Sequence, residues 1–513
     1  MSLDAAKGAG VLLYLFILLL IGIAASRRMR DARDFFAAGK SLGFWSVAFS
    51  ARATGESAWL LIGLTGMGAA IGVHAFWVVI GELLGVTIAW LVMSRRFKRL
   101  TDRYDSITMP DYFASRFGDT NHRLRLVSAL ALVVFVTIYV SAQIDATGTA
   151  FEKFLDWNYF VGAGVGFAVV LVYCVSGGFL AVAWSDVFQG ALMFFGLVGL
   201  PLVGFYMAGG VGPVLDGLTA IDTKLTHFSG ATEWNAMQVC SAISFALIGL
   251  GFLGSPQIFV RFLALRDEAE IKKGAAVAII WTLLADSGAV LTGMVGRHLL
   301  TTPGQPVDDV LGKSAEGVLP QLVEFALPAV LVGLFIAIVL SAIMSTIDSL
   351  LVVASSAVVR DVHQKIRHPN LADKDLISLS RIVTVGLAFV ALAIALSVAV
   401  LSKERTVFWF VIFGWSGISA TFCPTVILSL FWTKMTGKGA LAAMITGFVS
   451  VPLFKFAAPL IPEVGPYFKT LAELPPAFML SFLAGIVVSL MTQDDRPVDG
   501  EKDLSYAAGR SQD

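Results

Sequence analysis

Apolar stretches of about twenty residues recur along the whole chain, and this recurrence limits the possible folds more than any other feature of the sequence. Each stretch is long enough to cross the hydrocarbon core of a bilayer as a helix. Only 14% of the 513 residues are charged, whereas about a quarter are charged in an ordinary soluble domain. The sequence therefore predicts an all-α integral membrane protein with about 13 transmembrane helices.

The predicted spans form a single transmembrane domain over residues 1–491. They lie at residues 8–26, 43–72, 74–94, 126–150, 158–177, 179–208, 236–260, 274–297, 327–358, 379–401, 407–432, 439–460 and 475–491. The first span is followed by Arg27, Arg28 and Arg30, whereas a cleavable signal peptide carries its positive charge first. We therefore expect the first span to be retained.

Lysine and arginine gather in alternate loops, notably in segments 95–99, 261–273 and 360–374. Basic loops stay on the cytoplasmic side during insertion, so we expect these loops to be cytoplasmic in a multi-pass protein of the cell membrane. An odd number of spans then places the N-terminus outside and the polar tail, residues 492–513, inside. The polar composition of this tail predicts disorder.

Charge balance and missing motifs disfavour several classes of protein. The 37 basic and 37 acidic side chains cancel, so no overall field favours a nucleic-acid partner. The sequence has no Gly-rich nucleotide-binding motif that would indicate ATP-driven pumping, and no nucleophile and base that would indicate an enzyme. It favours a secondary transporter in the lipid bilayer, without an organic cofactor or an obligate protein partner. A membrane sensor built on a transporter fold is the alternative from another class, although no signalling domain is attached.

Two spans contain residues that interrupt a helix at the depth of the bilayer. Residues 50–59 read SARATGESAW, and residues 249–257 read GLGFLGSPQ. Interrupted backbone is tolerated in a membrane only where it is buried in protein or lines a cavity. If residues 43–208 and 236–432 are two five-helix units, each unit opens with a break, and the odd helix number inverts the second unit. The sequence thus predicts a five-plus-five inverted-repeat transporter core that binds its ligands between the broken helices.

Ionisable side chains inside the spans mark a candidate site, because a charge at the bilayer centre costs at least about 2.5 to 3.5 kcal/mol. Arg52 and Glu56 are four residues apart and can face each other on one helix side. They form either a structural ion pair or a ligand site, in which Arg52 steers a substrate carboxylate and Glu56 contributes negative potential near a cation. Glu82 is expected to be a packed partner, and Asp145, with Gln143, to lie at the outer mouth of the pocket.

Oxygen-bearing side chains cluster in the ninth span. Ser345, Asp348 and Ser349 share one helical face at spacings i, i+3 and i+4. Sodium is a hard cation and is expected to prefer such oxygen ligands. Alternatively, the serine hydroxyls bond their own helix, and Asp348 caps or pairs near the cytoplasmic boundary. Asp186 lies a few residues inside another span, close to its cytoplasmic end.

Six motifs, in the correct order, resemble those of the sodium:solute symporter family and most of all its sodium/proline symporters, from about residue 37 to residue 492. They are AGKSLG at 38–43, SAWLLIGLTG at 57–66, PDYFASRF at 110–117, SGGFLAVAWSD at 176–186, GSPQIFVRF at 254–262 and SAIMSTIDSLL at 341–351. The resemblance implies an inverted-repeat core and import of a small zwitterionic or carboxylate solute, with proline the leading candidate, coupled to inward sodium movement.

The resemblance also implies which residues bind sodium. The principal site would use the backbone oxygens of Ala53, Glu56 and Ala342 and the hydroxyls of Ser345 and Thr346. Asp186 would lie close by, and Asp348 with Ser349 would form a second cation site.

The implied substrate pocket lies at the two broken helices. Its expected residues are Arg52, Gly55, Glu56, Ser57, Trp59, Tyr139, Gln143, Ile248, Phe252 and Pro256. The proline symporters carry an aspartate at the position of Gly55, and a tryptophan and a tyrosine at those of Ile248 and Phe252. The pocket is therefore less able to donate hydrogen bonds, and the solute need not be proline. Proton coupling is the alternative to sodium coupling, because Glu56 is an additional carboxylate.

Overall fold

The computed structural model is helical, and its described residues hold no strand beyond an isolated parallel bridge between Leu42 and Leu265. The described residues are 3–27, 36–402, 404–495, 497 and 500–509. The helices of the first half are α1 (Leu3–Ser26), η1 (Ala38–Lys40), α3 (Phe44–Ala58), η2 (Trp59–Leu64), α4 (Thr65–Ile71), η3 (Gly72–Ala75), α5 (Phe76–Ile88), η4 (Ala89–Met93), α6 (Ser94–Arg103), α7 (Met109–Phe117), α8 (Arg123–Leu155), α9 (Tyr159–Met207), α10 (Val211–Ile221) and η5 (Thr223–Thr226). Those of the second half are α11 (Ala236–Ala246), η6 (Leu247–Leu253), α12 (Pro256–Ala264), η7 (Glu268–Glu270), α13 (Ile271–Leu300), α14 (Val307–Leu311), η8 (Lys313–Ala315), α15 (Val318–Ala326), α16 (Ala329–Ser356), η9 (Ala357–Arg367), η10 (Asp373–Asp375), α17 (Leu376–Leu401), α18 (Val407–Phe431), α19 (Gly437–Pro452), η11 (Leu453–Ala457), η12 (Ala458–Leu460), α20 (Gly465–Leu471), α21 (Leu474–Met491), η13 (Gln493–Asp495) and α22 (Gly500–Ala507).

Eleven helices of the described chain are long and apolar enough to cross a membrane, fewer than the predicted spans. Two predicted spans, 43–72 and 74–94, fall in one continuous helical run in which the chain turns at Gly72, where φ is 59°. The predicted span 158–177 lies in α9, where only a shorter apolar helix, Tyr159–Val169, is found. Each predicted span therefore coincides with helix, and the prediction of an all-helical membrane protein is confirmed.

Polar side chains start several helices where the chain leaves a loop. The Thr108 side chain accepts the Asp111 N–H at the start of α7, and Thr406 accepts the Trp409 N–H at the start of α18. Such caps satisfy N–H groups that have no partner inside the helix. Sequence thus sets both the apolar length of these helices and the point at which they begin.

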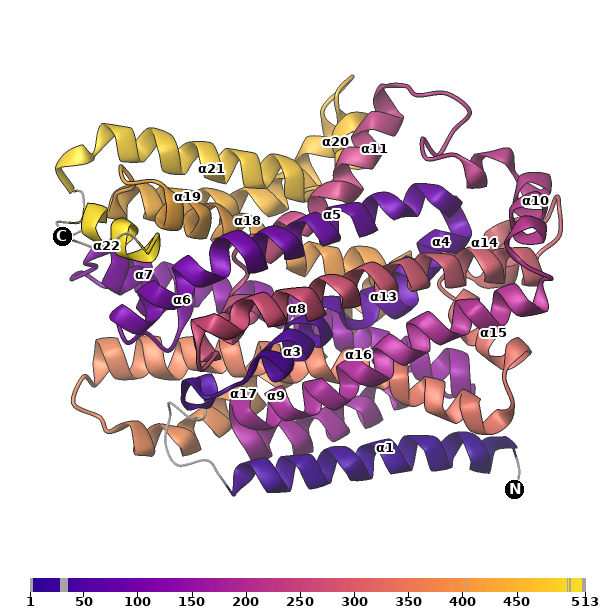
Figure 1. Cartoon of the computed structure of the whole chain (residues 1–513), viewed down its shortest axis with the longest axis horizontal. Coiled ribbons are helices and arrows are strands. Elements are labelled where there is room, and N and C mark those ends of the chain that lie inside the picture. Colours follow the sequence, from indigo (N-terminus) through magenta and orange to yellow (C-terminus); the bar gives the residue numbers. More distant parts are fainter. Residues whose placement is uncertain (1–2, 28–35, 403, 496, 498–499, 510–513) are drawn as a thin grey trace.

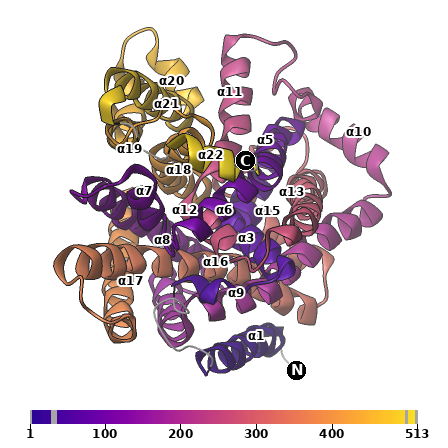
Figure 2. The same ribbon diagram turned by 60° about the vertical axis from the view of Figure 1, so that its left-hand side comes forward.

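The long helices lie side by side along the long axis of the molecule (Figure 1). α16 packs against α1, α3, α8 and α9, whereas α1 and the packed pair of α19 and α21 lie at opposite edges (Figures 1 and 2). α3 also packs against α12 and α13. The helices that carry the predicted site residues are therefore enclosed by other helices.

Both predicted helix breaks are present. In α3, Ser57 has a φ of 50° and a ψ of −165°, which joins two helices at that residue. In the second broken segment, η6 ends before Gly254, whose φ is 157°, and Pro256 starts α12. A positive φ is strained for a serine, and such strain concentrates at functional sites. The limits of the two repeats, 43–208 and 236–432, stay a prediction.

The C-terminal tail differs from its predicted disorder, because α22 packs against α6. Arg103 Nε lies 3.3 Å from an Asp503 carboxylate oxygen, and Tyr104 donates a hydrogen bond to the same side chain. The Arg99 guanidinium donates to the Ala507 carbonyl at 3.3 Å. Basic side chains of α6 thus bind the polar tail through an ion pair and a hydrogen bond, which the sequence of the tail alone does not reveal.

Candidate functional site

Two hydroxyls of α16 reach the backbone of α3 beside its break. Ser345 Oγ donates to the Ala53 carbonyl at 3.0 Å, and Thr346 Oγ1 donates to the Thr54 carbonyl at 3.2 Å. Both hydroxyls also bond to the Ala342 carbonyl at 3.1 Å. All of these residues are buried. The structure thus brings together all the expected sodium ligands except one, as neutral oxygens of the kind that a hard cation prefers.

The remaining expected ligand, the backbone oxygen of Glu56, accepts the N–H of Trp59. The Glu56 side chain pairs with Arg52. The described contacts therefore tie Glu56 to its own segment.

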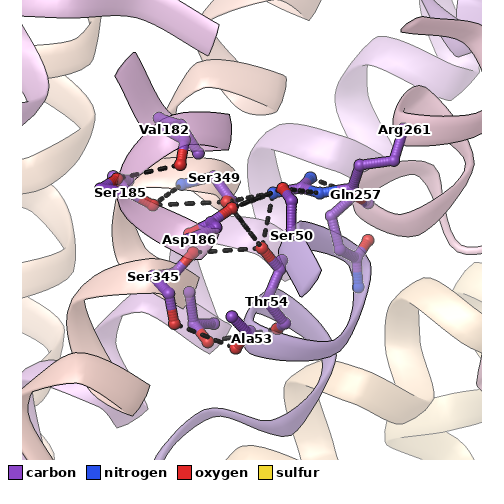
Figure 3. A network of polar contacts seen from close by, with 12 residues as sticks. Ser50, Ala53, Thr54, Val182, Ser185, Asp186, Gln257, Arg261, Ser345 and Ser349 are labelled. Atoms are coloured by element: carbon purple, nitrogen blue, oxygen red, sulfur yellow. Dashed lines mark hydrogen bonds and ion pairs between the residues drawn. The ribbon is translucent and has the colours of Figure 1, made fainter. Parts of the chain in front are cut away.

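An arginine that the sequence assigns to a cytoplasmic loop instead lies buried at the centre of a polar network (Figure 3). Arg261 Nη2 donates to Asp186 at 3.1 Å. The same nitrogen donates to the hydroxyls of Thr54 and Ser349, both at 2.5 Å. Arg261 Nε donates to the Ser50 hydroxyl at 2.9 Å. The loop prediction for Arg261 is wrong because α12 continues past this residue while packed on α3.

This guanidinium contacts Asp186, which was expected close to the principal sodium site, and Ser349, which was expected in the second cation site. Asp186 is neutralised by Arg261 and also accepts a hydrogen bond from Ser50 at 2.6 Å. Asp348 Oδ1 accepts the N–H of Ser349 at 2.5 Å, within its own helix. Asp348 thus accepts a hydrogen bond within its own helix, and the second cation site stays a prediction.

The break in α3 is joined to α8 by polar side chains. Gln143 Nε2 donates to the Ser57 hydroxyl at 3.3 Å, and the Tyr139 hydroxyl donates to it at 3.4 Å. Gln143 Oε1 accepts the Ala58 N–H at 3.1 Å. The break leaves backbone groups without partners inside the helix, and Gln143 of α8 supplies an acceptor for one of them, the Ala58 N–H. Ser57, Tyr139 and Gln143 therefore meet as the predicted pocket requires.

The residues at positions 55 and 252 depend on each other. A Cβ atom on Gly55 would lie 2.9 Å from the Phe252 ring, which is tighter than side-chain contacts normally allow. Trp59 Nε1 donates to the Gly55 carbonyl at 3.3 Å, which fixes the same segment of α3. Phe252 thus occupies the space that a side chain at position 55 would need, so the glycine at position 55 and the phenylalanine at position 252 depend on each other.

Trp415 of α18 packs among the residues that are expected to form the pocket, although the sequence analysis did not single it out. Its Nε1 donates to the Ile248 carbonyl at 3.0 Å. Its ring centroid lies 5.1 Å from that of Phe252 and 6.4 Å from that of Tyr139. Pro256, four residues after Phe252, starts α12 beyond the break. No spacing in the sequence relates Trp415 to the broken helices, so only packing identifies it.

Arg52 forms the ion pair that its spacing from Glu56 predicts. Its Nη2 also lies 3.3 Å from Glu82, the expected packed partner, and its guanidinium lies over the Phe252 ring at 4.8 Å from the centroid. The structure favours the ion-pair alternative for Arg52. The carboxylate of Asp286, in α13, lies close to those of Glu56 and Glu82. The sequence analysis did not name Asp286, although a single carboxylate in the middle of an apolar span is a signal that could have identified it.

Ionic contacts tie one end of α8 to α18. Asp145 lies 2.8 Å from Arg405, just before α18, and accepts the Tyr159 hydroxyl at 2.5 Å. Nearby, Glu316 accepts the first two N–H groups of α18, each at 3.0 Å. Burial raises the pKa of Glu316 to about 7. Asp145 thus joins α8 to the segment before α18, and its place at the outer mouth of the pocket stays a prediction.

A second ionic network holds the opposite end of α8. Arg125 lies 2.6 Å from Asp111 and 2.5 Å from Asp361. Thr108 donates to Asp361 at 3.1 Å, and Arg360 lies 3.6 Å from Asp111. Both ends of α8 are therefore fastened to other elements by charged side chains.

Comparisons with known proteins match both the sequence and the fold of this chain. The sequence pattern of the sodium:solute symporter family matches residues 35–447. The chain belongs to this family. The symporter is 36% identical to the high-affinity proline transporter PutP of Bacillus subtilis (strain 168), over 93% of this chain and 96% of that protein. It is 34% identical to the osmoregulated proline transporter OpuE of the same organism, over 96% of each chain. It is 32% identical to the sodium/proline symporter of Escherichia coli (strain K12), over 93% of this chain and 91% of that protein.

Two solved structures share the fold of the symporter. One is a sodium-coupled sialic acid symporter in a substrate-bound outward-open state, with a TM-score of 0.76 at 17% identity, covering 95% of this chain and 98% of that one. The other is Mhp1, a nucleobase-cation-symport-1 family transporter, with a TM-score of 0.51 at 14% identity, covering 92% of this chain and 98% of that one. The predicted inverted-repeat fold is confirmed. The chain is a sodium-coupled solute symporter of the membrane and not an enzyme.

Proposed function

We propose that the symporter imports a small zwitterionic or carboxylate solute, with proline the first candidate, together with sodium. The observation that carries this proposal is the contact of Ser345 and Thr346 with the backbone of broken α3. The proline relatives support the solute class. The packing of Phe252 against Gly55 keeps other small solutes as candidates.

The solute would bind beside the break in α3. Ser57, Tyr139 and Gln143 offer hydrogen-bonding groups there, and Phe252 and Trp415 offer apolar faces. Broken helices suit such ligands, because freed backbone groups and helix ends can meet charged groups. A zwitterion needs both features, since its charged ends require polar partners and its body requires apolar contact.

In the proposed mechanism, sodium bridges α3 and α16 by binding to the carbonyl of Ala53 and the hydroxyls of Ser345 and Thr346. Sodium binding stabilises the outward-open arrangement, and solute binding at the two broken helices then permits closure. Rocking of the core opens the inner side, with the Arg125 and Asp145 contacts at the ends of α8 breaking in turn. The membrane potential contributes about 2.3 kcal/mol per charge per 100 mV.

We also propose the membrane orientation predicted from the basic loops. The N-terminus would face outward and residues 492–513 would face the cytoplasm of the cell, with residues 1–491 as one transport domain. The segments rich in lysine and arginine support this orientation.

The test is uptake of radiolabelled proline into proteoliposomes with an imposed sodium gradient, alongside a panel of unlabelled competitors. We expect sodium-dependent accumulation that Ser345→Ala abolishes, because the variant removes one ligand from the α3–α16 contact. Ser355→Ala is the matched control, since Ser355 is also buried in α16 but, among the described residues, its hydroxyl bonds only the Val352 carbonyl of its own helix. Uptake that persists without sodium and rises as external pH falls would indicate proton coupling. A lack of accumulation for every solute would favour the sensor.

A further inference from the structure

A cavity of about 580 Å³ lies between the start of α18, the segment from η11 to η12, and α20. We call it the α20 cavity. It shares no lining residue with the predicted substrate pocket beside the break in α3, so it is a separate space. Its aromatic and charged lining residues are Trp409, Phe454, Phe468, Lys455, Lys469 and Glu473.

Glu473 lacks a partner for one of its carboxylate oxygens. The residue is 1% exposed and comes directly before α21. Its Oε2 lies 3.3 Å from Lys455 Nζ, whereas its Oε1 has no hydrogen-bond donor among the described residues. A buried acceptor without a donor is unfavourable, most of all when it is charged. The Glu473 carboxylate therefore suits a ligand that brings a positively charged N–H donor.

The two lysines of the cavity differ in their surroundings. Lys455 is held by Glu473, and its Nζ lies 5.5 Å from the centroid of the Trp409 ring. Lys469 is exposed and forms no ion pair with the described residues. Two lysines and one glutamate leave an excess of one positive charge, so the ligand also needs an anionic group.

We propose that the α20 cavity binds a small zwitterion with an apolar body, of the kind of proline or leucine, as a second solute site. The ammonium donates to Glu473 Oε1, the carboxylate meets Lys469, and the body contacts the rings of Phe454 and Phe468. The volume falls within the range of roughly 300 to 1,000 Å³ that is typical of small-molecule sites.

Aromatic packing links the α20 cavity to the broken helix. The Phe408 ring centroid lies 5.0 Å from that of Trp409 and 6.1 Å from that of Trp59 in η2. Trp409 and Trp415 are six residues apart on α18, which is roughly 9 Å along a helix. As a waiting site for the transported solute, the cavity rests on the proposed function. As a binding site, it does not.

The test is the labelling rate of a thiol placed in the cavity. Leu460→Cys introduces it, because Leu460 lines the cavity and is 80% exposed. The purified full-length variant, in phosphatidylglycerol nanodiscs without sodium or a gradient, is reacted with a maleimide, and mass spectrometry gives the rate at each cysteine. Leu401→Cys is the matched control, since Leu401 is 84% exposed at the end of α17, outside the cavity.

We expect L-proline and L-leucine to slow labelling at position 460 and not at position 401, with half occupancy halving the rate. Pyrrolidine lacks the carboxylate and cyclopentanecarboxylate lacks the ammonium, so both should protect more weakly. Adding Glu473→Gln should raise the protective L-proline concentration at least about tenfold, because the ammonium loses a charged partner. Glu463→Gln, at an exposed residue of the same loop, should leave that concentration unchanged.

Three outcomes would overturn the proposal. The first is no protection of position 460 by either amino acid, and the second is equal protection by pyrrolidine or cyclopentanecarboxylate. The third is protection in phosphatidylcholine nanodiscs without amino acid, which would assign the cavity to a zwitterionic lipid headgroup. If Glu473→Gln does not fold, Lys469→Gln at the exposed lysine decides the question, because it should also weaken protection.

This result is independent of transport. Labelling needs no sodium gradient, so failure of proline uptake with protection at position 460 would leave the α20 cavity as a binding site. Proline uptake without that protection would reject the α20 cavity alone.

Discussion

Single residues determine how charge is compensated in the interior of this symporter. Arg261 donates to Asp186 and to three hydroxyls in a fully buried network. An arginine guanidinium suits such a position, because its donors point in several fixed directions and it stays charged. Asp186 and its neighbours are therefore set in place by a residue that the sequence assigns to a loop.

We expect Arg261→Gln to destabilise the folded symporter by about 3 to 5 kcal/mol, because it leaves the buried Asp186 without its counter-charge. The double variant Arg261→Gln with Asp186→Asn should regain part of that loss. Thermal unfolding of the purified proteins, followed by tryptophan fluorescence, measures both effects.

Arg266→Gln is the control for this pair of variants. The Arg266 side chain is 60% exposed and pairs with Glu270, so its loss should leave the unfolding temperature nearly unchanged. Equal unfolding temperatures for Arg261→Gln and the unmodified protein would contradict a stabilising role for this buried pair.

At the scale of elements, α5 and the second broken helix approach each other backbone to backbone. A Cβ atom added to Gly81 would overlap the Ala246 carbonyl, and one added to Gly249 would overlap the Gly81 carbonyl. Small residues allow such contact between helices in a membrane, where van der Waals packing replaces the hydrophobic effect. This contact positions η6, which carries Ile248 and Phe252, against the helix that carries Glu82.

We expect Gly81→Ala to destabilise the symporter by at least about 1 to 3 kcal/mol, because the extra methyl forces two backbones apart. Gly386→Ala in α17 is the control, since a Cβ there meets nothing within 4 Å. Unfolding temperatures and purified yields of the two variants should differ. A similar unfolding temperature for both would show that the backbones can separate freely.

At the scale of the whole molecule, α8 links two ionic networks, one at each end. The Arg125 network fastens it to α7 and η9, and the Asp145 network fastens it to the segment before α18. Glu316 holds the start of α18 to the segment before α15. Charged contacts therefore hold both ends of α8 to other elements, so the stability of the symporter is sensitive to ionisation.

We expect the stability of the symporter to fall as pH rises from about 4.5 to about 7, because the pKa of Glu316 is raised from 4.5 to about 7 by burial. Below this window the carboxyl is protonated in both the folded and unfolded states. Within it, the unfolded chain loses the proton first. The full loss is at most about 3 kcal/mol, and partial exposure of Glu316 reduces it.

Glu316→Gln should remove this part of the pH dependence, because the amide does not ionise but can still accept an N–H. Thermal unfolding of both proteins across this pH range is the measurement. Identical pH slopes for the two proteins would contradict the assignment to Glu316.

The sequence by itself determined the helical spans, the two broken helices and the residues that are expected to be the main oxygen ligands. The bilayer requires long apolar segments, so their spacing was visible directly. Ser57 lies in the first predicted break, and Gly254 and Pro256 lie in the second, because helix-breaking residues act locally. Ser345 and Thr346 were found through a motif and meet α3 as expected.

Only the tertiary structure decided how the buried charges and rings are paired. Arg261 and Asp186 are 75 residues apart in the chain, and Trp415 and Ile248 are 167 residues apart. The structure also gives the polar tail a helix on α6. A local pattern fixes the residue types within a segment, but the partner of a buried side chain depends on how distant segments pack.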